Sequence, residues 1–162
     1  MLEMMKRTKF RPYSGVWELT LRCNMNCLHC GSRAGKPRGD ELTIDELLTV
    51  ADDLARLGCK MITLSGGEPL MRKEWPLVAA RLSSKGVAVN MISNGFSFRE
   101  RELEQARKSG MNNVAFSIDG DQKIHDKIRN KRNAYKRVME AVDLCVDKGY
   151  PPAVNTHITN AN

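Results

Sequence analysis

Three cysteines stand within eight residues in the stretch Cys23-Asn24-Met25-Asn26-Cys27-Leu28-His29-Cys30, with the spacing C-x3-C-x2-C. Thiolate is the preferred ligand of iron–sulfur clusters and also a good ligand of zinc. Three thiols would ligate three irons of a four-iron cluster and leave the fourth iron open to a ligand that is not protein. A structural zinc site would instead use four protein ligands. The stretch therefore predicts a metal centre, either iron–sulfur or zinc.

The alternatives to an iron–sulfur cluster are a closed zinc site and a disulfide framework. A closed zinc site would add His29 or His125 to the three cysteines, but His29 directly precedes Cys30, and adjacent residues reach one ion poorly. A disulfide framework is disfavoured because five cysteines cannot all pair and nothing in the sequence indicates secretion. The two remaining cysteines, Cys59 and Cys145, are expected to be plain core thiols.

Length and composition indicate one globular domain. The chain has 162 residues, of which 41% are hydrophobic and 28% charged. No apolar run approaches the roughly 20 residues of a membrane-spanning helix, so no membrane association is expected. Residues 1–14 read as a basic extension without the apolar segment of a signal peptide. With five cysteines and no export signal, the sequence predicts a reducing, cytoplasmic environment.

The net charge of +7 favours acidic partners, such as nucleic acid or an acidic peptide. Positive residues are concentrated only in residues 123–137, which we interpret as solvated helix surface. No aromatic residues are interleaved there in the way that single-stranded nucleic acid requires. The pattern therefore disfavours nucleic acid as the partner.

Apolar periodicity predicts strands alternating with helices along the whole chain. Thr43 and Glu46 form a capping box at the start of the first expected helix, and Gly58 closes it. The expected strands cover residues 16–21, 61–64, 87–92, 114–118 and 153–158. The expected helices cover residues 44–57, 73–84, 99–108, 122–128 and 134–147. This alternation predicts an α/β fold of parallel strands joined by right-handed crossovers.

The unusual loops all follow strands. The cysteine loop follows the first strand, Gly66-Gly67-Glu68-Pro69 the second, Ser93-Asn94-Gly95 the third and Asp119-Gly120 the fourth. Ligands bind at the carboxyl ends of the strands in parallel barrels and sheets. The separate motifs are therefore expected to converge on one mouth.

These motifs together resemble the radical S-adenosylmethionine (radical SAM) enzymes over about residues 15–160. The cysteine spacing is followed one βα unit later by a Gly-Gly-Glu-Pro turn, and the run His125-Asp126-Lys127-Ile128-Arg129 resembles one in the branch that modifies peptides and haem precursors. The resemblance implies that residues 15–162 form a partial parallel (β/α) barrel of about five βα units, incomplete relative to the six units of the family core.

The resemblance also implies the cofactors and their contacts. Cys23, Cys27 and Cys30 would ligate a 4Fe–4S cluster whose open iron binds the amino and carboxylate groups of S-adenosylmethionine (SAM). The resemblance places His29 near adenine, and Gly66 and Gly67, followed by Pro69, near the methionine amine. Glu68 would either brace that loop or add a carboxylate near the amine. The remaining positions implied to contact SAM are Ser93, Asn94, Ser117 and Asp119 at strand ends near the ribose or carboxylate, and Arg129 near the carboxylate.

The implied activity is reductive cleavage of SAM. An electron donor such as flavodoxin or ferredoxin would reduce the cluster, and SAM would yield methionine and a 5′-deoxyadenosyl radical that abstracts hydrogen from a substrate. The branch suggests a peptide or a small molecule such as a tetrapyrrole. No motif in the sequence identifies the substrate.

The sequence departs from the family in ending after the fifth expected strand, without late cysteines for further clusters. An unpaired strand edge would invite a second copy or a completing chain. The alternatives to an enzyme are therefore an incomplete or non-catalytic cluster- and SAM-binding fragment, and a zinc-binding structural protein.

Overall fold

Five parallel strands form one sheet in this computed structural model, which describes residues 11–160 and 162. The strands stand in chain order, each paired with the next, and cover β1 (Ser14–Glu18), β2 (Met61–Ser65), β3 (Ala88–Ser93), β4 (Asn113–Ser117) and β5 (Pro152–Asn155). Strand order equal to chain order is the order of a (β/α) barrel, in which each helix crosses over to the neighbouring strand. The expected α/β fold with parallel strands is confirmed.

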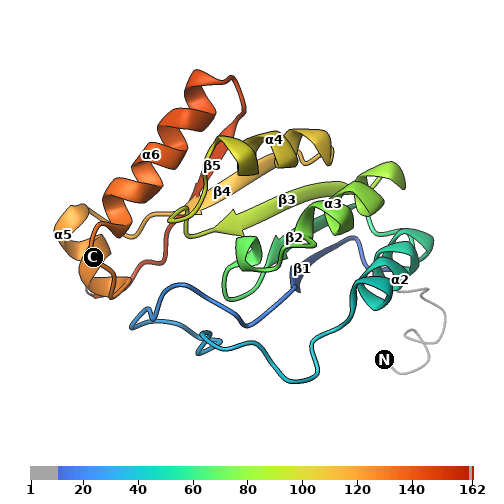
Figure 1. The fold of residues 1–162 in the computed structure, drawn as a ribbon, viewed down its shortest axis with the longest axis horizontal. Helices are drawn as coiled ribbons and strands as arrows, with labels where there is room; N and C mark the ends of the chain where they lie inside the picture. Colours follow the sequence, from blue (N-terminus) through green and yellow to red (C-terminus); the bar gives the residue numbers. More distant parts are fainter. Residues whose placement is uncertain (1–10, 161) are drawn as a thin grey trace, which may run out of the picture.

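The connecting helices lie on one side of the sheet, as Figure 1 shows, whereas residues 19–43 form a long loop that contacts Glu68 after β2 and Ser97 after β3. This long segment contains no helix or named strand, only one isolated bridge between Arg22 and Gly35. The helices are α2 (Ile44–Arg56), the 3-10 helix η1 (Pro69–Met71), α3 (Trp75–Ser84), α4 (Glu100–Lys108), α5 (Gln122–Ile128) and α6 (Ala134–Asp147).

The core lies between the sheet and the helices. Alternate residues of the central strands, among them Val89, Met91 and Phe116, are fully buried against apolar residues of α3, α4 and α6. Phe116 packs edge-on against Phe98, with ring centroids 5.1 Å apart. The alternation follows from the two-residue period of a strand, which sends neighbouring side chains to opposite faces.

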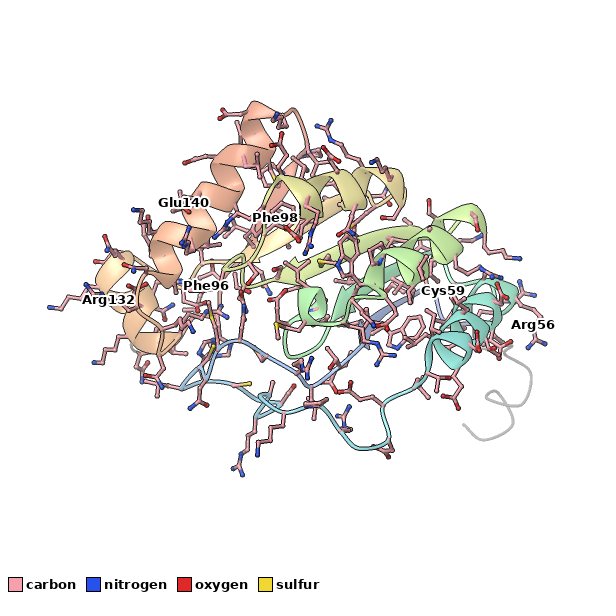
Figure 2. The ribbon with its side chains drawn as sticks, in the orientation of Figure 1. Arg56, Cys59, Phe96, Phe98, Arg132 and Glu140 are labelled. Atoms are coloured by element: carbon pink, nitrogen blue, oxygen red, sulfur yellow. The ribbon has the colours of Figure 1, made fainter. Side chains whose placement is uncertain are left out.

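Cys59 and Cys145 belong to this core, at 3% and 0% exposure. Burial raises the pKa of Cys145 to about 11. Figure 2 labels Cys59 beside α2, remote from the cysteine loop. The prediction that these two residues are core thiols is confirmed.

The ends of the elements differ from the expected ranges in two informative places. The first strand covers residues 14–18 rather than 16–21, because residues 19–22 leave the ladder and bond instead to the loop after β2. The fifth strand ends at Asn155 rather than 158, because Thr156 and His157 bond to Ile118 and Asp119, the two residues after β4.

Part of the expected basic extension, residues 1–10, lies outside the described residues. In the described part of the chain, no helix is both long enough and apolar enough to cross a bilayer.

Candidate functional site

A cavity of about 310 Å³ opens at the carboxyl ends of the strands. It is lined by every predicted site residue except Pro69, together with eight neighbours that include Met25, Ile92, Asn155 and His157. Pro69 is buried behind the loop and begins η1, where its fixed φ suits the first turn of a helix. The four motifs that follow separate strands therefore do converge on one mouth.

The Gly66-Gly67 turn reaches this mouth because the backbone after β1 lies directly against it. Gly67 N donates to Thr20 O at 2.7 Å, and Glu68 N donates to Arg22 O at 2.9 Å. A Cβ on Gly66 would lie 2.4 Å from Thr20 O, and a Cβ on Gly67 would lie 2.5 Å from Arg22 O. Only glycine allows this approach, which places Arg22 and hence Cys23 beside the turn.

Backbone bonds hold the three cysteines against two other segments. Cys23 N donates to Gly35 O at 3.1 Å, and Leu28 N donates to Ile128 O, at the end of α5, at 2.9 Å. Cys30 Sγ accepts from Ala34 N at 3.4 Å. All three thiols are unpaired, partly exposed and lining the cavity, so they are available as ligands.

Burial raises the pKa of the thiols of Cys23 and Cys27, while the Arg129 guanidinium opposes this effect at Cys27. Within the described residues, no group of three His, Cys, Asp or Glu side chains is arranged to hold a single metal ion. A zinc ion needs its ligands within about 2–2.3 Å of one point. A four-iron cluster, in contrast, spreads its thiolate ligands over separate irons.

Glu68 braces the site from inside. It is 1% exposed, and its carboxylate accepts from Ser93 Oγ at 2.8 Å, Asn94 N at 2.8 Å and Leu70 N at 3.2 Å. Burial raises the pKa of Glu68 to about 7, although these hydrogen bonds and Arg129 act in the opposite direction. The carboxylate thus ties the loop after β2 to the loop after β3.

Asn94 ties the same loop to the cysteine loop. Its Nδ2 donates to Asn24 Oδ1 at 2.7 Å, and its Oδ1 accepts from Phe96 N at 2.9 Å. Asn24 in turn donates to Ser97 Oγ at 3.0 Å. Sequence reasoning missed Asn24, although its position directly after Cys23 could have suggested a structural role in the loop.

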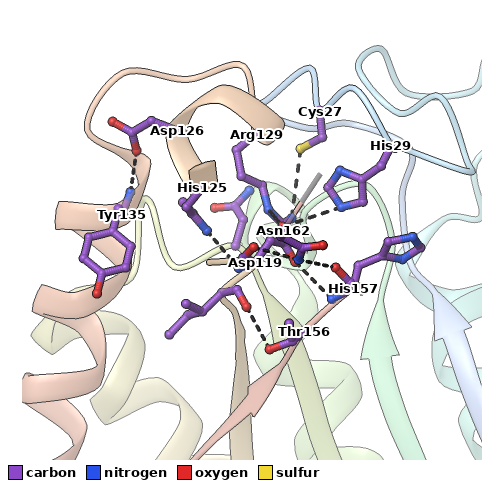
Figure 3. Close-up of polar contacts among 12 residues, drawn as sticks. Cys27, His29, Asp119, His125, Asp126, Arg129, Tyr135, Thr156, His157 and Asn162 are labelled. Carbon is purple, nitrogen blue, oxygen red and sulfur yellow. Dashed lines mark hydrogen bonds and ion pairs between the residues drawn. The ribbon is translucent and has the colours of Figure 1, made fainter. Parts of the chain in front are cut away.

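Asp119 is the centre of the polar network drawn in Figure 3. Its buried carboxylate accepts from Arg129 Nε at 2.7 Å and from His157 N at 3.1 Å, and lies 3.6 Å from His29 Nε2. Its backbone N donates to His125 Nδ1 at 3.1 Å. The Asp119 carboxylate therefore holds the cysteine loop, the residue after α5 and the segment after β5 together.

His29 forms part of the cavity wall. Its ring packs at 50° against His157, with centroids 5.0 Å apart. Burial, and next the Arg129 charge, lower the pKa of His29. A neutral aromatic ring at this place can pack against a flat ligand.

One further residue that sequence reasoning missed is Glu41, which fixes the start of the cysteine loop. Its carboxylate accepts from Leu21 N at 2.8 Å, from Thr20 Oγ1 at 2.9 Å and from Arg38 N at 3.1 Å. Arg72 lies 3.5 Å away as a counter-ion. Glu41 lies 20 residues after Leu21 in a stretch without periodicity, so no local sequence signal marks this contact.

Comparison with known proteins agrees with this geometry. The family model described as the radical SAM superfamily matches residues 17–160, nearly the whole chain. This chain belongs to the radical SAM superfamily. Members of the superfamily use a 4Fe–4S cluster and SAM. Three thiols and the Gly66-Gly67 turn line one cavity in this chain.

The curated relatives include a heme synthase and a maturation protein. The AdoMet-dependent heme synthase of Methanosarcina barkeri is 34% identical over 150 residues, covering 91% of this chain and 43% of the relative. The sporulation killing factor maturation protein SkfB of Bacillus subtilis is 32% identical over 153 residues, covering 94% and 37%. This chain thus spans about two fifths of the length of the curated relatives that it matches.

Solved structures share the fold. Streptococcus suis SuiB bound to the precursor peptide SuiA superposes with a TM-score of 0.82 at 15% identity, over 96% of this chain and 35% of SuiB. The protein anSMEcpe with bound AdoMet gives a TM-score of 0.72 at 16% identity, over 88% and 43%. The partial radical SAM barrel expected from the sequence is confirmed.

Proposed function

We propose that the protein binds a 4Fe–4S cluster through Cys23, Cys27 and Cys30 and cleaves SAM reductively. The observation that carries this proposal is the meeting of the three thiols and the Gly66-Gly67 turn in one cavity. Three thiolates suit a cluster with one iron left for an exogenous ligand. When bound, the cluster and SAM supply a 5′-deoxyadenosyl radical for hydrogen abstraction from a substrate.

The chain's own residues would bind and orient SAM around the cluster. Gly66 and Gly67 line the cavity and would present backbone carbonyls to the methionine amine. The predicted roles of the other lining residues stay proposals: His29 against adenine, and Ser93, Asn94 and Ser117 at the ribose or carboxylate.

Glu68, Asp119 and Pro69 are better suited to support than to direct contact. The carboxylates of Glu68 and Asp119 already accept hydrogen bonds from several protein donors. Pro69 does not line the cavity. Arg129 retains donors for the SAM carboxylate, because its contacts with Asp119 and Cys27 use only two of the five N–H groups of a guanidinium.

The proposed substrate is a peptide or a small molecule such as a tetrapyrrole. The support for it is the set of relatives named as AdoMet-dependent heme synthases and as a PqqA peptide cyclase. A net charge of +7 favours a substrate with carboxylates, which both classes can carry. A low-potential electron carrier such as flavodoxin or ferredoxin would supply the electron.

Anaerobic reconstitution with iron and sulfide tests the proposal. We expect about four irons per chain, as a 4Fe–4S cluster requires, and 5′-deoxyadenosine once SAM and dithionite are added. A variant with Cys23, Cys27 and Cys30 all changed to alanine should lose the cluster and the product together. Cys145→Ala is the matched control: it removes a thiol from the core and should keep both.

The competing functions give other results in the same experiment. A cluster without 5′-deoxyadenosine would favour a non-catalytic cluster-binding fragment that needs a further chain segment or partner. One zinc per chain and no iron would favour a zinc-binding structural protein. Retention of the cluster by the triple alanine variant would overturn the assignment of the site.

A further inference from the structure

Arg129 is held between the central carboxylate and one of the three thiols. It caps the end of α5, where its N donates to His125 O at 2.8 Å. Its Nε donates to Asp119 Oδ2 at 2.7 Å, and its Nη1 lies 4.0 Å from Cys27 Sγ. The Arg129 side chain is 12% exposed and the Asp119 side chain 0%. The guanidinium is therefore fixed on one side by a buried ion pair and directed at Cys27 on the other, as Figure 3 shows.

The backbone reinforces the same approach. Leu28 N, which follows Cys27, donates to the carbonyl of Ile128, which precedes Arg129, at 2.9 Å. The peptide groups beside Cys27 and beside Arg129 are thus bonded directly to each other. Cys27 Sγ and the guanidinium are held near each other by a side-chain contact and a backbone bond at once.

The three thiols differ in the hydrogen-bond donors that lie beside them. Among the described residues, Cys27 is the thiol with a charged side-chain donor, whereas the donor to Cys30 Sγ is the neutral backbone N of Ala34. Hydrogen bonds with a charged donor are shorter and roughly twice as strong as neutral ones. A cluster bound here would therefore have a charged donor beside Cys27, at 4.0 Å, and a neutral backbone donor beside Cys30, at 3.4 Å.

We infer that Arg129, positioned by Asp119, raises the reduction potential of the cluster by donating to the Cys27 thiolate. This inference rests on the proposed cluster at the three cysteines. Reduction adds one electron, supplied by a low-potential one-electron donor, and no bond to the cluster is made or broken. Hydrogen bonds to cluster sulfurs and nearby positive charge stabilise the more negative reduced state and so raise the potential.

A redox titration of the reconstituted protein, followed by electron paramagnetic resonance without SAM, tests this inference. Arg129→Gln should shift the midpoint potential to more negative values, so that less than half of the cluster is reduced at the wild-type midpoint. Arg129→Lys keeps the charge but loses the planar fork, and should give a smaller shift in the same direction. Omitting SAM separates this role from any contact between Arg129 and the SAM carboxylate.

Arg132→Gln is the matched control, since Arg132 is exposed three residues further along the chain. Figure 2 labels it at the outer edge of the molecule beside α5. It loses the same charge without a contact to a thiol, so its midpoint should equal that of the wild type. An equal shift in Arg129→Gln and Arg132→Gln would overturn the inference, because it would report net charge alone.

The outcomes also separate this inference from the proposed function. A wild-type protein that assembles no cluster refutes the proposed function. A wild-type cluster whose midpoint is unchanged in both Arg129 variants refutes the role of Arg129 and leaves the cluster in place. If Arg129→Gln fails to retain the cluster, Arg129→Lys and the wild type decide: exchange into D2O should shift the Fe–S(Cys) resonance Raman bands of the wild type, and unshifted bands would contradict the hydrogen bond.

Discussion

Glycine is required at position 67 because two carbonyl oxygens occupy the place of a side chain. A Cβ there would lie 2.5 Å from Arg22 O and 2.6 Å from Leu21 O. Both oxygens belong to backbone that leads into Cys23, so neither can rotate away. The position of Cys23 thus depends on the absence of a side chain at residue 67, more than 40 residues further along the chain.

Gly67→Ala should therefore destabilise the fold by at least about 2 kcal/mol, since overpacking against backbone cannot relax by a change of rotamer. We also expect loss of cluster iron, because the backbone that leads into Cys23 must move. Gly39→Ala is the control, as nothing lies within 4 Å of a Cβ at that position, and it should change stability by no more than about 0.5 kcal/mol. Urea denaturation and iron analysis measure both effects, and equal stability of the two variants would contradict the contact.

Glu68 makes stability depend on pH. Its pKa is raised to about 7 by burial, whereas the unfolded chain has the ordinary value near 4.5. Because the folded-state pKa is the higher one, its stabilising effect is complete below about pH 4.5 and is lost as the pH rises through 7. The difference of roughly 2.5 pKa units corresponds to about 3 kcal/mol.

Glu68→Gln removes this titration, so the free energy of unfolding of the variant should lack the fall that the wild type shows between pH 5 and pH 8. The variant loses acceptors for the donors Ser93 and Asn94, so its stability should be lower at pH 5 and closer to that of the wild type at pH 8. Urea titrations of the cluster-free proteins at both pH values provide the measurement. Parallel pH profiles of the two proteins would show that the Glu68 carboxyl does not titrate in this range.

At this scale, residue types were easier to predict than their partners. The three cysteines and the glycine pair carry recognisable chemistry, and the structure brings them to one cavity. The Asp119–Arg129 ion pair could not be predicted, because the turn and helix between these residues decide whether the side chains meet. The same holds for Asn24 and Asn94, which lie 70 residues apart.

At the scale of the elements, helix α2 begins with a local signal that the sequence displays. Thr43 N donates to Glu46 Oε2 at 2.8 Å, and Glu46 N donates to Thr43 Oγ1 at 3.4 Å, which completes the predicted capping box. Helix starts of this kind are predictable because the contacts span three residues. The end of β1 could not be predicted in this way, because residues 19–22 bond to a loop more than 40 residues away instead of continuing the ladder.

Thr43→Ala should lower the free energy of unfolding by about 1 kcal/mol, the usual cost of a lost N-cap. Thr49→Ala, on the exposed face of the same helix, makes the same chemical change and should be neutral or slightly stabilising, because alanine has the higher helix propensity. Thermal unfolding followed by circular dichroism compares the two. A Thr49→Ala variant as unstable as Thr43→Ala would show that the loss is not due to the cap.

At the scale of the whole molecule, a regular sheet-and-helix layer carries a long irregular segment. Residues 19–43 have one isolated bridge and an internal contact between Leu21 and Glu41. Separate contacts hold the segment to the glycine turn, Asn94 and the end of α5. Such a segment has less cooperative support than the sheet, whose strands pair along their lengths. A ligand that bonds to three residues of this segment would therefore contribute much of the stability of the segment.

Reconstitution of the cluster should raise the Tm of the protein, because a group that binds the folded state alone stabilises it by mass action. We expect a rise of at least about 5 °C, which corresponds to roughly 2 kcal/mol for a chain of this size. The variant with Cys23, Cys27 and Cys30 changed to alanine should show no rise, whereas Cys145→Ala should lower the Tm of both forms and keep the difference between them. Since the thiols lie in the irregular segment and not in the sheet, hydrogen exchange should slow most in residues 19–43. Slowing confined to the strands, or a rise in Tm of the triple variant, would place the stabilising ligand elsewhere.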